Sequence, residues 1–112
     1  MRLDAGKLRS RIEWSSEYRP EWDGDAALYV EHNVVGWGRS RRLGMLRLGS
    51  VKAYLGVQHV DPMRAGWAIV DEPQARFFLS LFVGGECVTL RVFPSMGAAL
   101  DALLSFLSRV GD

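Results

Sequence analysis

Two apolar segments separated by a Gly-Gly pair constrain the fold of this chain more than any other feature. The segments are residues 77–83 and 86–93, and Gly84 and Gly85 lie between them. The central positions of the tightest hairpin turns need positive φ, which glycine adopts at little cost. The pattern therefore predicts an antiparallel β-hairpin with a two-residue turn.

The alternation of side chains predicts the register of this hairpin. On one face a two-residue turn pairs Leu81 with Val88, Leu79 with Leu90, and Phe77 with Val92. The other face then carries the pairs Ser80–Thr89 and Phe78–Arg91. Because a shift of one residue would mix the two sets, turn chemistry and hydrophobic pattern support the same register.

The segment after the hairpin has the spacing of an amphipathic helix. Ser95 can accept a hydrogen bond from the first helical turn, and Pro94 precedes it. Apolar residues then recur every three or four positions, at Met96, Leu100, Leu103, Leu104, Leu107 and Val110. Such a stripe has to be buried, and we expect it to pack on the Leu/Val face of the hairpin.

A second hairpin is predicted between residues 43 and 60. Leu43–Leu48 and Val51–Val60 flank Gly49 and Ser50, a two-residue turn with glycine first. One face of the second strand would carry Val51, Ala53, Leu55 and Val57, and the other Lys52, Tyr54 and Gln58. A short helix over residues 43–48 is the alternative, because Gly44 weakens a strand.

Shorter segments complete the expected sheet. Alternation from Leu8 to Trp14 predicts a strand, with a helix over residues 3–12 as the alternative because Leu8 and Ile12 are four apart. Residues 27–35 are rich in β-formers and are expected to form a strand, as are residues 67–70. Proline, glycine and charged residues predict loops or turns at 15–25, 36–42 and 61–66.

The expected class is a single α+β domain over residues 1–112. It has an antiparallel sheet of about five to seven strands and one C-terminal amphipathic helix packed on one face. Hydrophobic residues at 48% and charged residues at 24% are typical of a globular chain rather than a disordered one. Neither a signal-peptide pattern nor an apolar run of about 20 residues is visible, so we expect a cytoplasmic protein without membrane contact.

Residues that often carry chemistry lack the spacing that chemistry needs. His32 and His59 have no second ligand at metal-binding spacing near them. The single Cys87 has no neighbouring base in the sequence, and we expect it to be a small buried residue on the face of Phe82. These residues therefore predict no nucleophile and no metal site.

Other reactive motifs are also missing. There is no nucleophile elbow and no phosphate-binding glycine loop in the sequence. Three carboxylates, Glu21, Asp23 and Asp25, fall in a predicted loop without the calcium-binding pattern, so we expect a solvated acidic loop. The sequence thus predicts no catalytic residue, no metal and no cofactor, and a protein that is not an enzyme.

One basic segment suggests a binding surface. No acidic residue occurs between positions 33 and 60, and the candidate binding residues of this stretch are Trp37, Arg39, Arg41, Arg42 and Arg47. Tryptophan and arginine often anchor protein interfaces, and arginine beside an exposed aromatic also contacts nucleic acids. A solvated charged turn explains the run equally well. The net charge of +1 favours a protein partner over a polyanion.

A second candidate surface lies on the C-terminal helix. Its expected outer face carries small residues, including Ala98, Ala102 and Ser105. Small residues allow close approach, so this face would suit a twofold homodimer. A weakly charged face in contact with solvent is the alternative.

The sequence alone therefore predicts a small non-enzymatic protein that binds another protein, as an inhibitor, immunity protein or regulatory factor. Of 14 basic residues only Lys7 and Lys52 are lysine. Because arginine codons are G/C-rich, this bias points to a high-GC bacterium, phage or plasmid. One alternative is a nucleic-acid-binding module that uses the Trp-containing loop 36–47. Another is a small-ligand domain or enzyme whose pocket, on the second sheet face, is lined by Tyr54, Phe78 and Phe82.

Overall fold

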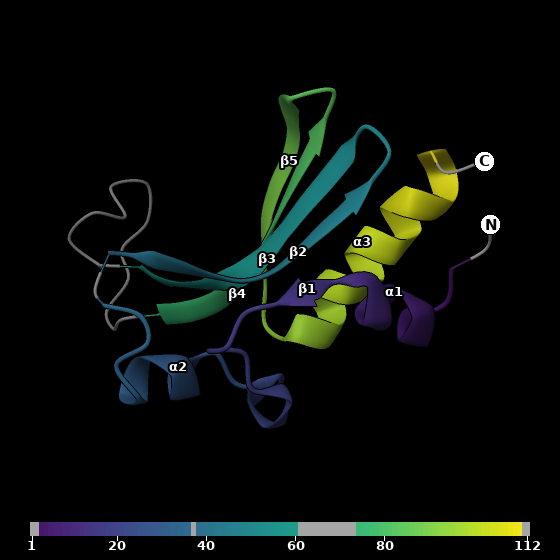
Figure 1. The fold of residues 1–112 in the computed structure, drawn as a ribbon. Helices are drawn as coiled ribbons and strands as arrows, with labels where there is room; N and C mark the ends of the chain where they lie inside the picture. The colour runs from purple at the N-terminus through teal and green to yellow at the C-terminus, as the bar shows by residue number, and fades with distance from the viewer. Residues whose placement is uncertain (1–2, 37, 61–73, 111–112) are drawn as a thin grey trace.

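An antiparallel sheet with helices against one face makes up the described part of the chain, residues 3–36, 38–60 and 74–110 of a computed structural model (Figure 1). The strands described are β1 (Glu13–Trp14), β2 (Ser40–Leu48), β3 (Val51–Val60), β4 (Gln74–Val83) and β5 (Glu86–Phe93), adjacent in that order. The helices are α1 (Ala5–Arg11), α2 (Ala27–Glu31) and α3 (Met96–Val110), with a 3₁₀ turn at Pro20–Trp22. The predicted α+β class and the C-terminal helix against the sheet are confirmed.

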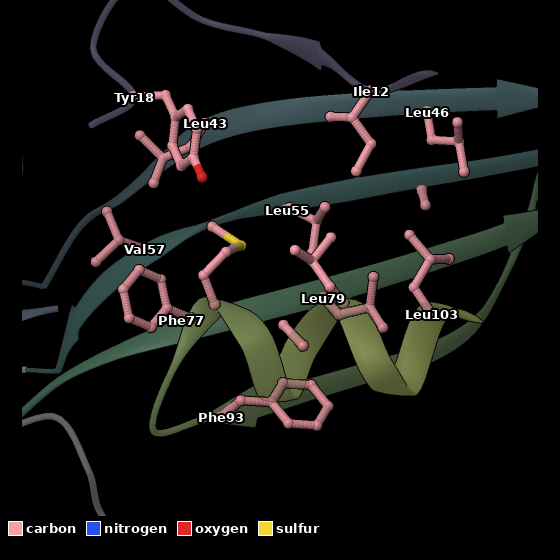
Figure 2. Close-up of a cluster of buried hydrophobic side chains, with 14 of the residues drawn as sticks. Ile12, Tyr18, Leu43, Leu46, Leu55, Val57, Phe77, Leu79, Phe93 and Leu103 are labelled. Atoms are coloured by element: carbon pink, nitrogen blue, oxygen red, sulfur yellow. The ribbon is translucent and has the colours of Figure 1, made fainter. Parts of the chain in front are cut away.

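The hydrophobic core lies between the sheet and the helices. Leu55 of β3 and Leu79 of β4 point toward Leu103 of α3 in Figure 2, and all three are buried. Leu8 of α1 and Tyr29 of α2 are fully buried in the same cluster. Because the three helices bury their apolar residues together, they cover one face of the sheet. No described helix covers the other face.

The hairpin of β2 and β3 confirms the predicted turn and face pattern. Leu48 pairs with Val51 across a turn in which Gly49 has a φ of 58°. Residues 43–48 are strand, so the alternative of a helix there is wrong. Strand β2 already begins at Ser40, because residues 40–42 pair with β3 although they were expected to belong to a loop.

The hairpin of β4 and β5 has the predicted turn but a different register. Gly84 and Gly85 both have positive φ, and Val83 pairs with Glu86 and Phe82 with Cys87. An irregularity opposite Leu81 and Phe82 then inserts one extra residue, so that Leu81 pairs with Thr89 rather than with Val88. A β-bulge of this kind moves every later side chain of its strand to the other face.

The altered register exchanges the residues that β5 sends into the core. Phe93 lies opposite Phe77, in the place predicted for Val92, and is buried beside the start of α3 (Figure 2). Val88, Leu90 and Val92, expected to pack under the helix, are instead exposed. The bulge thus buries one large aromatic ring and leaves an aliphatic row outside.

Helix α3 begins as its sequence predicts. The Ser95 hydroxyl oxygen accepts a hydrogen bond of 3.1 Å from the amide of Ala98, which satisfies one free donor of the first turn. Met96 and Leu103 are fully buried, and Leu100 and Leu107 nearly so, as expected for an amphipathic stripe.

Replacing Ser95 with alanine is therefore expected to lower the free energy of unfolding by about 1 kcal/mol. Urea denaturation followed by tryptophan fluorescence measures this change. Ser108→Ala, near the other end of the same helix, is the matched control, because its hydroxyl donates to the carbonyl of Ser105 instead of capping an N-terminus. Equal costs for the two variants would contradict the capping role.

Two N-terminal segments predicted as strands are short helices. Residues 5–11 form α1, so the strand predicted from Leu8 to Trp14 is correct only at Glu13–Trp14, which form β1, and the helical alternative is close to the structure. The carboxylate of Asp4 caps α1 by accepting a 2.8 Å hydrogen bond from the amide of Lys7. Residues 27–31 form α2, because Asp25 accepts from the amide of Ala27 and the helix buries Tyr29 against the sheet. Tertiary packing overrides the β-forming composition here.

The expected solvated acidic loop is wrong for Asp23. Its Oδ2 atom accepts hydrogen bonds from Arg9 at 3.0 Å and from the Tyr18 hydroxyl at 2.8 Å, while Arg9 also donates to that hydroxyl oxygen. Burial, followed by the hydrogen bond to the Asp23 carboxylate, raises the pKa of Tyr18 above its ordinary value. The ring of Trp14 stacks on Tyr18 at 3.9 Å between centroids. This cluster ties the N-terminal segments together.

The last predictions for the fold concern residues that the structure does not describe. The turn at 61–66 and the short strand at 67–70 lie outside the described residues. Within the described ranges, no helix is long and apolar enough to cross a membrane.

Candidate binding surface

The face of strands β2 to β5 that points away from α3 is here called the open sheet face. Residues directly opposite each other in neighbouring strands share a face, so the pairing identifies its members. Tyr54 lies opposite Met45 on one side and Ser80 on the other, and Phe82 lies opposite Lys52. The open sheet face is therefore built from aromatic, small polar and basic side chains.

A depression of about 400 Å³ lies near the middle of this face. It is lined by Ser40 and Arg42 of β2, Tyr54 of β3, and Phe78, Ser80 and Phe82 of β4. Three of these residues, Tyr54, Phe78 and Phe82, were predicted from the sequence to line a pocket on the second face of the sheet. The depression combines aromatic walls, two hydroxyl groups and one guanidinium group.

The aromatic side chains of the depression hold one another in place. The ring of Phe82 meets that of Tyr54 edge to face, with 5.6 Å between centroids. The guanidinium carbon of Arg42 lies 5.0 Å from the centroid of Tyr54, within the range of a cation–π contact. Arg42 is nevertheless exposed, so its charge remains available at the rim.

Gly56 makes room for the floor of the depression. It pairs with Phe78, and a Cβ atom at position 56 would lie about 2.4 Å from a ring carbon of Phe78. The same atom would lie 2.3 Å from the backbone oxygen of Arg41. Because glycine has no Cβ, the Phe78 ring can lie across strand β3, and only 9% of Phe78 is exposed.

Strand β5 borders the depression with exposed aliphatic side chains. Val88, Leu90 and Val92 are 50%, 67% and 49% exposed, the large apolar residues that stand out on the described surface. Val92 lies opposite Phe78 and Leu90 opposite Ser80, so this row continues from the depression toward the edge of the sheet. An apolar patch joined to a concave aromatic site is typical of a docking surface.

The open sheet face is also basic. The register places four cationic side chains on it, Arg42, Arg47, Lys52 and Arg76. Among the described residues, the carboxylate on the same side of the sheet is that of Glu13 in the neighbouring strand β1, opposite Met45 at the far edge. In a chain with a net charge of +1, this uneven distribution favours a partner with negative groups at its rim.

The sheet separates the basic residues that the sequence grouped together. Arg42 and Arg47 lie on the open face. Arg41 reaches the other side, where it donates to Glu17 at 3.2 Å and to the carbonyl of Val34 at 3.2 Å. Arg39 is exposed just before β2, and Trp37 lies outside the described residues. The structure therefore brings two of the five candidate residues onto one surface.

The candidate dimer surface on α3 is less open than the sequence suggests. Ala98 and Ala102 are half-buried and pack against the core cluster, whereas Ser105 is exposed. The three small residues do not form one exposed stripe.

The histidines and the cysteine occupy ordinary positions. His32 ends α2 with Nδ1 2.8 Å from the carbonyl oxygen of Leu28, and His59 is buried in β3. Cys87 shares the face of Phe82 as predicted, but it is exposed because it lies on an edge strand, so its expected burial is wrong. No group of three potential metal ligands occurs within the described ranges.

The aliphatic row of β5 is the part of the candidate surface that sequence reasoning missed. Its residues alternate as core residues would, and nothing within residues 86–92 marks the bulge that turns them outward. Phe93 next to Pro94 was the available signal, because a large ring at a helix entry needs burial.

Comparison of the chain with protein-family models, with curated proteins and with solved structures finds no match.

Proposed function

We propose that this chain is a non-enzymatic binding protein that docks another protein on its open sheet face. The observation that carries the proposal is the continuity between the aromatic depression and the exposed row of Val88, Leu90 and Val92. Aliphatic side chains that are about half exposed or more contribute most binding free energy when a partner removes them from water.

The residues at the rim support a protein as the partner. Arginine and tyrosine are the residues that most often carry the binding energy of protein interfaces. Here Arg42 lies against the ring of Tyr54, so both are partly ordered before a partner arrives. Preorganised anchors cost less conformational entropy when they bind. An acidic and apolar surface on the partner would match this arrangement.

The biological role that we propose is that of a small inhibitor, immunity protein or regulatory factor from a bacterium, phage or plasmid. The arginine-rich composition supports this origin. Such proteins act by occupying a surface of their target, for which a preformed sheet face is sufficient.

A nucleic acid is the second candidate partner. The four cations of the open sheet face favour it, because arginine and lysine neutralise phosphates and exposed aromatics can stack on bases. The salt dependence of binding separates the two candidates. Phosphate contacts predict that the logarithm of the association constant falls steeply and linearly with the logarithm of the salt concentration.

Capture of a binding partner from a nuclease-treated lysate tests the proposal. We expect Arg42→Glu to reduce the amount of captured protein about tenfold or more, because it reverses the charge beside Tyr54. Arg109→Glu is the matched control, since it makes the same change at an exposed position on α3. Equal capture by the two variants would contradict a partner on the open sheet face. Loss of all capture on nuclease treatment would favour nucleic acid instead.

A further inference from the structure

We propose that a second copy of this chain pairs antiparallel with strand β5, joining two sheets into one about a twofold axis at Leu90. This inference concerns the edge of the sheet and goes beyond the partner proposed for the depression. It rests on the position of β5, on the side chains that β5 exposes and on the way its charges would meet.

Strand β5 is the long exposed edge of the described sheet. It spans eight residues, and β4 is its neighbour on one side while no described strand lies on the other. The opposite edge carries β1, which is two residues long. Proteins usually protect long edges with charged side chains or proline, because free backbone groups can pair with another chain. On the open face, β5 presents Leu90 and Val92 at its edge instead.

A twofold axis through Leu90 makes this edge complementary to itself. Antiparallel pairing about that point places Leu90 beside Leu90 of the second copy, and Val88 beside Val92 of the second copy. The aliphatic side chains of the two copies would lie next to one another, and the open faces of both copies would lie on the same side of the joined sheet, where the joined row remains accessible to the proposed partner. These side chains are 49–67% exposed in the single chain, so contact with the second copy would remove much apolar surface from water and stabilise the dimer.

The charges of β5 select this register. A twofold axis at Arg91 would place two guanidinium groups side by side, and like charges directly opposite each other are destabilising. An axis at Thr89 would place Glu86 against Val92. With the axis at Leu90, Arg91 instead lies beside Thr89 of the second copy, so no like charges face each other. The bulge at the turn end limits the ladder to the residues around Leu90.

Cysteine cross-linking tests the register directly. Directly opposite residues of antiparallel strands have Cα atoms about 4.5–5.5 Å apart, which suits a disulfide. In a Cys87→Ser background, we expect Leu90→Cys to form a covalent dimer under mild oxidation. Ser105→Cys in the same background tests pairing through α3 and should stay monomeric. Native Cys87 should also cross-link poorly, because the two copies would be about six residues, or roughly 20 Å, apart along the strands.

Sedimentation equilibrium tests the same interface without oxidation. We expect the wild-type chain to show a reversible monomer–dimer equilibrium, and Leu90→Lys to weaken dimerisation at least tenfold by placing two ammonium groups at the axis. Ser105→Lys is the control and should leave the equilibrium unchanged. Leu90 is largely exposed, so its replacement should not unfold the chain, and circular dichroism checks this.

Two results would overturn the inference. One is a wild-type chain that stays monomeric at about 0.5 mM, and the other is cross-linking through Ser105→Cys that equals or exceeds that through Leu90→Cys. The dimer and the proposed partner can fail separately. Arg42→Glu should lose the partner and keep the dimer, because Arg42 lies on β2, away from the β5 edge.

Discussion

Replacing Tyr29 with alanine is expected to lower the free energy of unfolding by about 3–5 kcal/mol. Tyr29 is fully buried, and its ring meets those of Trp22 and Phe77 edge to face at 4.8 and 6.2 Å between centroids. Its hydroxyl oxygen accepts a 3.0 Å hydrogen bond from the amide of Arg19. The truncation therefore removes a large buried ring together with the acceptor of the Arg19 amide.

Two matched variants separate these contributions in urea denaturation experiments. Tyr29→Phe keeps the ring and removes the hydroxyl, so we expect a loss of about 1–3 kcal/mol. Glu31→Ala changes an exposed residue of the same helix and should have little effect. If Tyr29→Ala costs no more than Tyr29→Phe, helix α2 does not pack on the sheet as described.

Replacing Gly56 with alanine is expected to lower the free energy of unfolding by about 3 kcal/mol, at the upper end for an overpacked site. The added Cβ would collide with the backbone oxygen of Arg41, and a backbone atom cannot move aside as a side chain can. It would also push the ring of Phe78 off strand β3. We therefore expect partner binding at the depression to weaken as well.

Gly24→Ala is the matched control for Gly56→Ala. A Cβ atom at position 24 would meet nothing within 4 Å, so this change should be nearly neutral. Thermal and urea denaturation of both variants give the comparison. Equal stability of the two variants would mean that Phe78 does not need the space above Gly56.

The parts of the fold that could be predicted from the sequence carry their signals locally. Gly84 and Gly85 specify a tight turn by their positive φ, and Gly49 does the same for the other hairpin. Ser95 caps α3 through a contact three residues along the chain. Such features need no distant partner, so a short window of sequence contains them.

The parts that could not be predicted depend on contacts between distant segments. Residues 27–31 resemble a strand in composition, and they are helical because Tyr29 is buried against Phe77 of β4. The bulge in β5 accompanies the burial of Phe93, and nothing within residues 86–92 marks its position. The candidate binding surface could be predicted only in part, for the same reason. Tyr54, Phe78 and Phe82 could be assigned to one face, but Val88, Leu90 and Val92 were expected in the core.

A single hydrogen bond has a consequence for the order of folding. The amide of Met96, at the start of α3, donates to the carbonyl oxygen of Asp23 at 2.8 Å. The carboxylate of Asp23 also accepts hydrogen bonds from Arg9 and Tyr18, so segments far apart in the sequence contact one another at this point. Contacts of such long sequence separation form slowly. During synthesis on the ribosome, α1 would therefore reach its final packing only after α3 has emerged, whereas the two hairpins can form as soon as they are made.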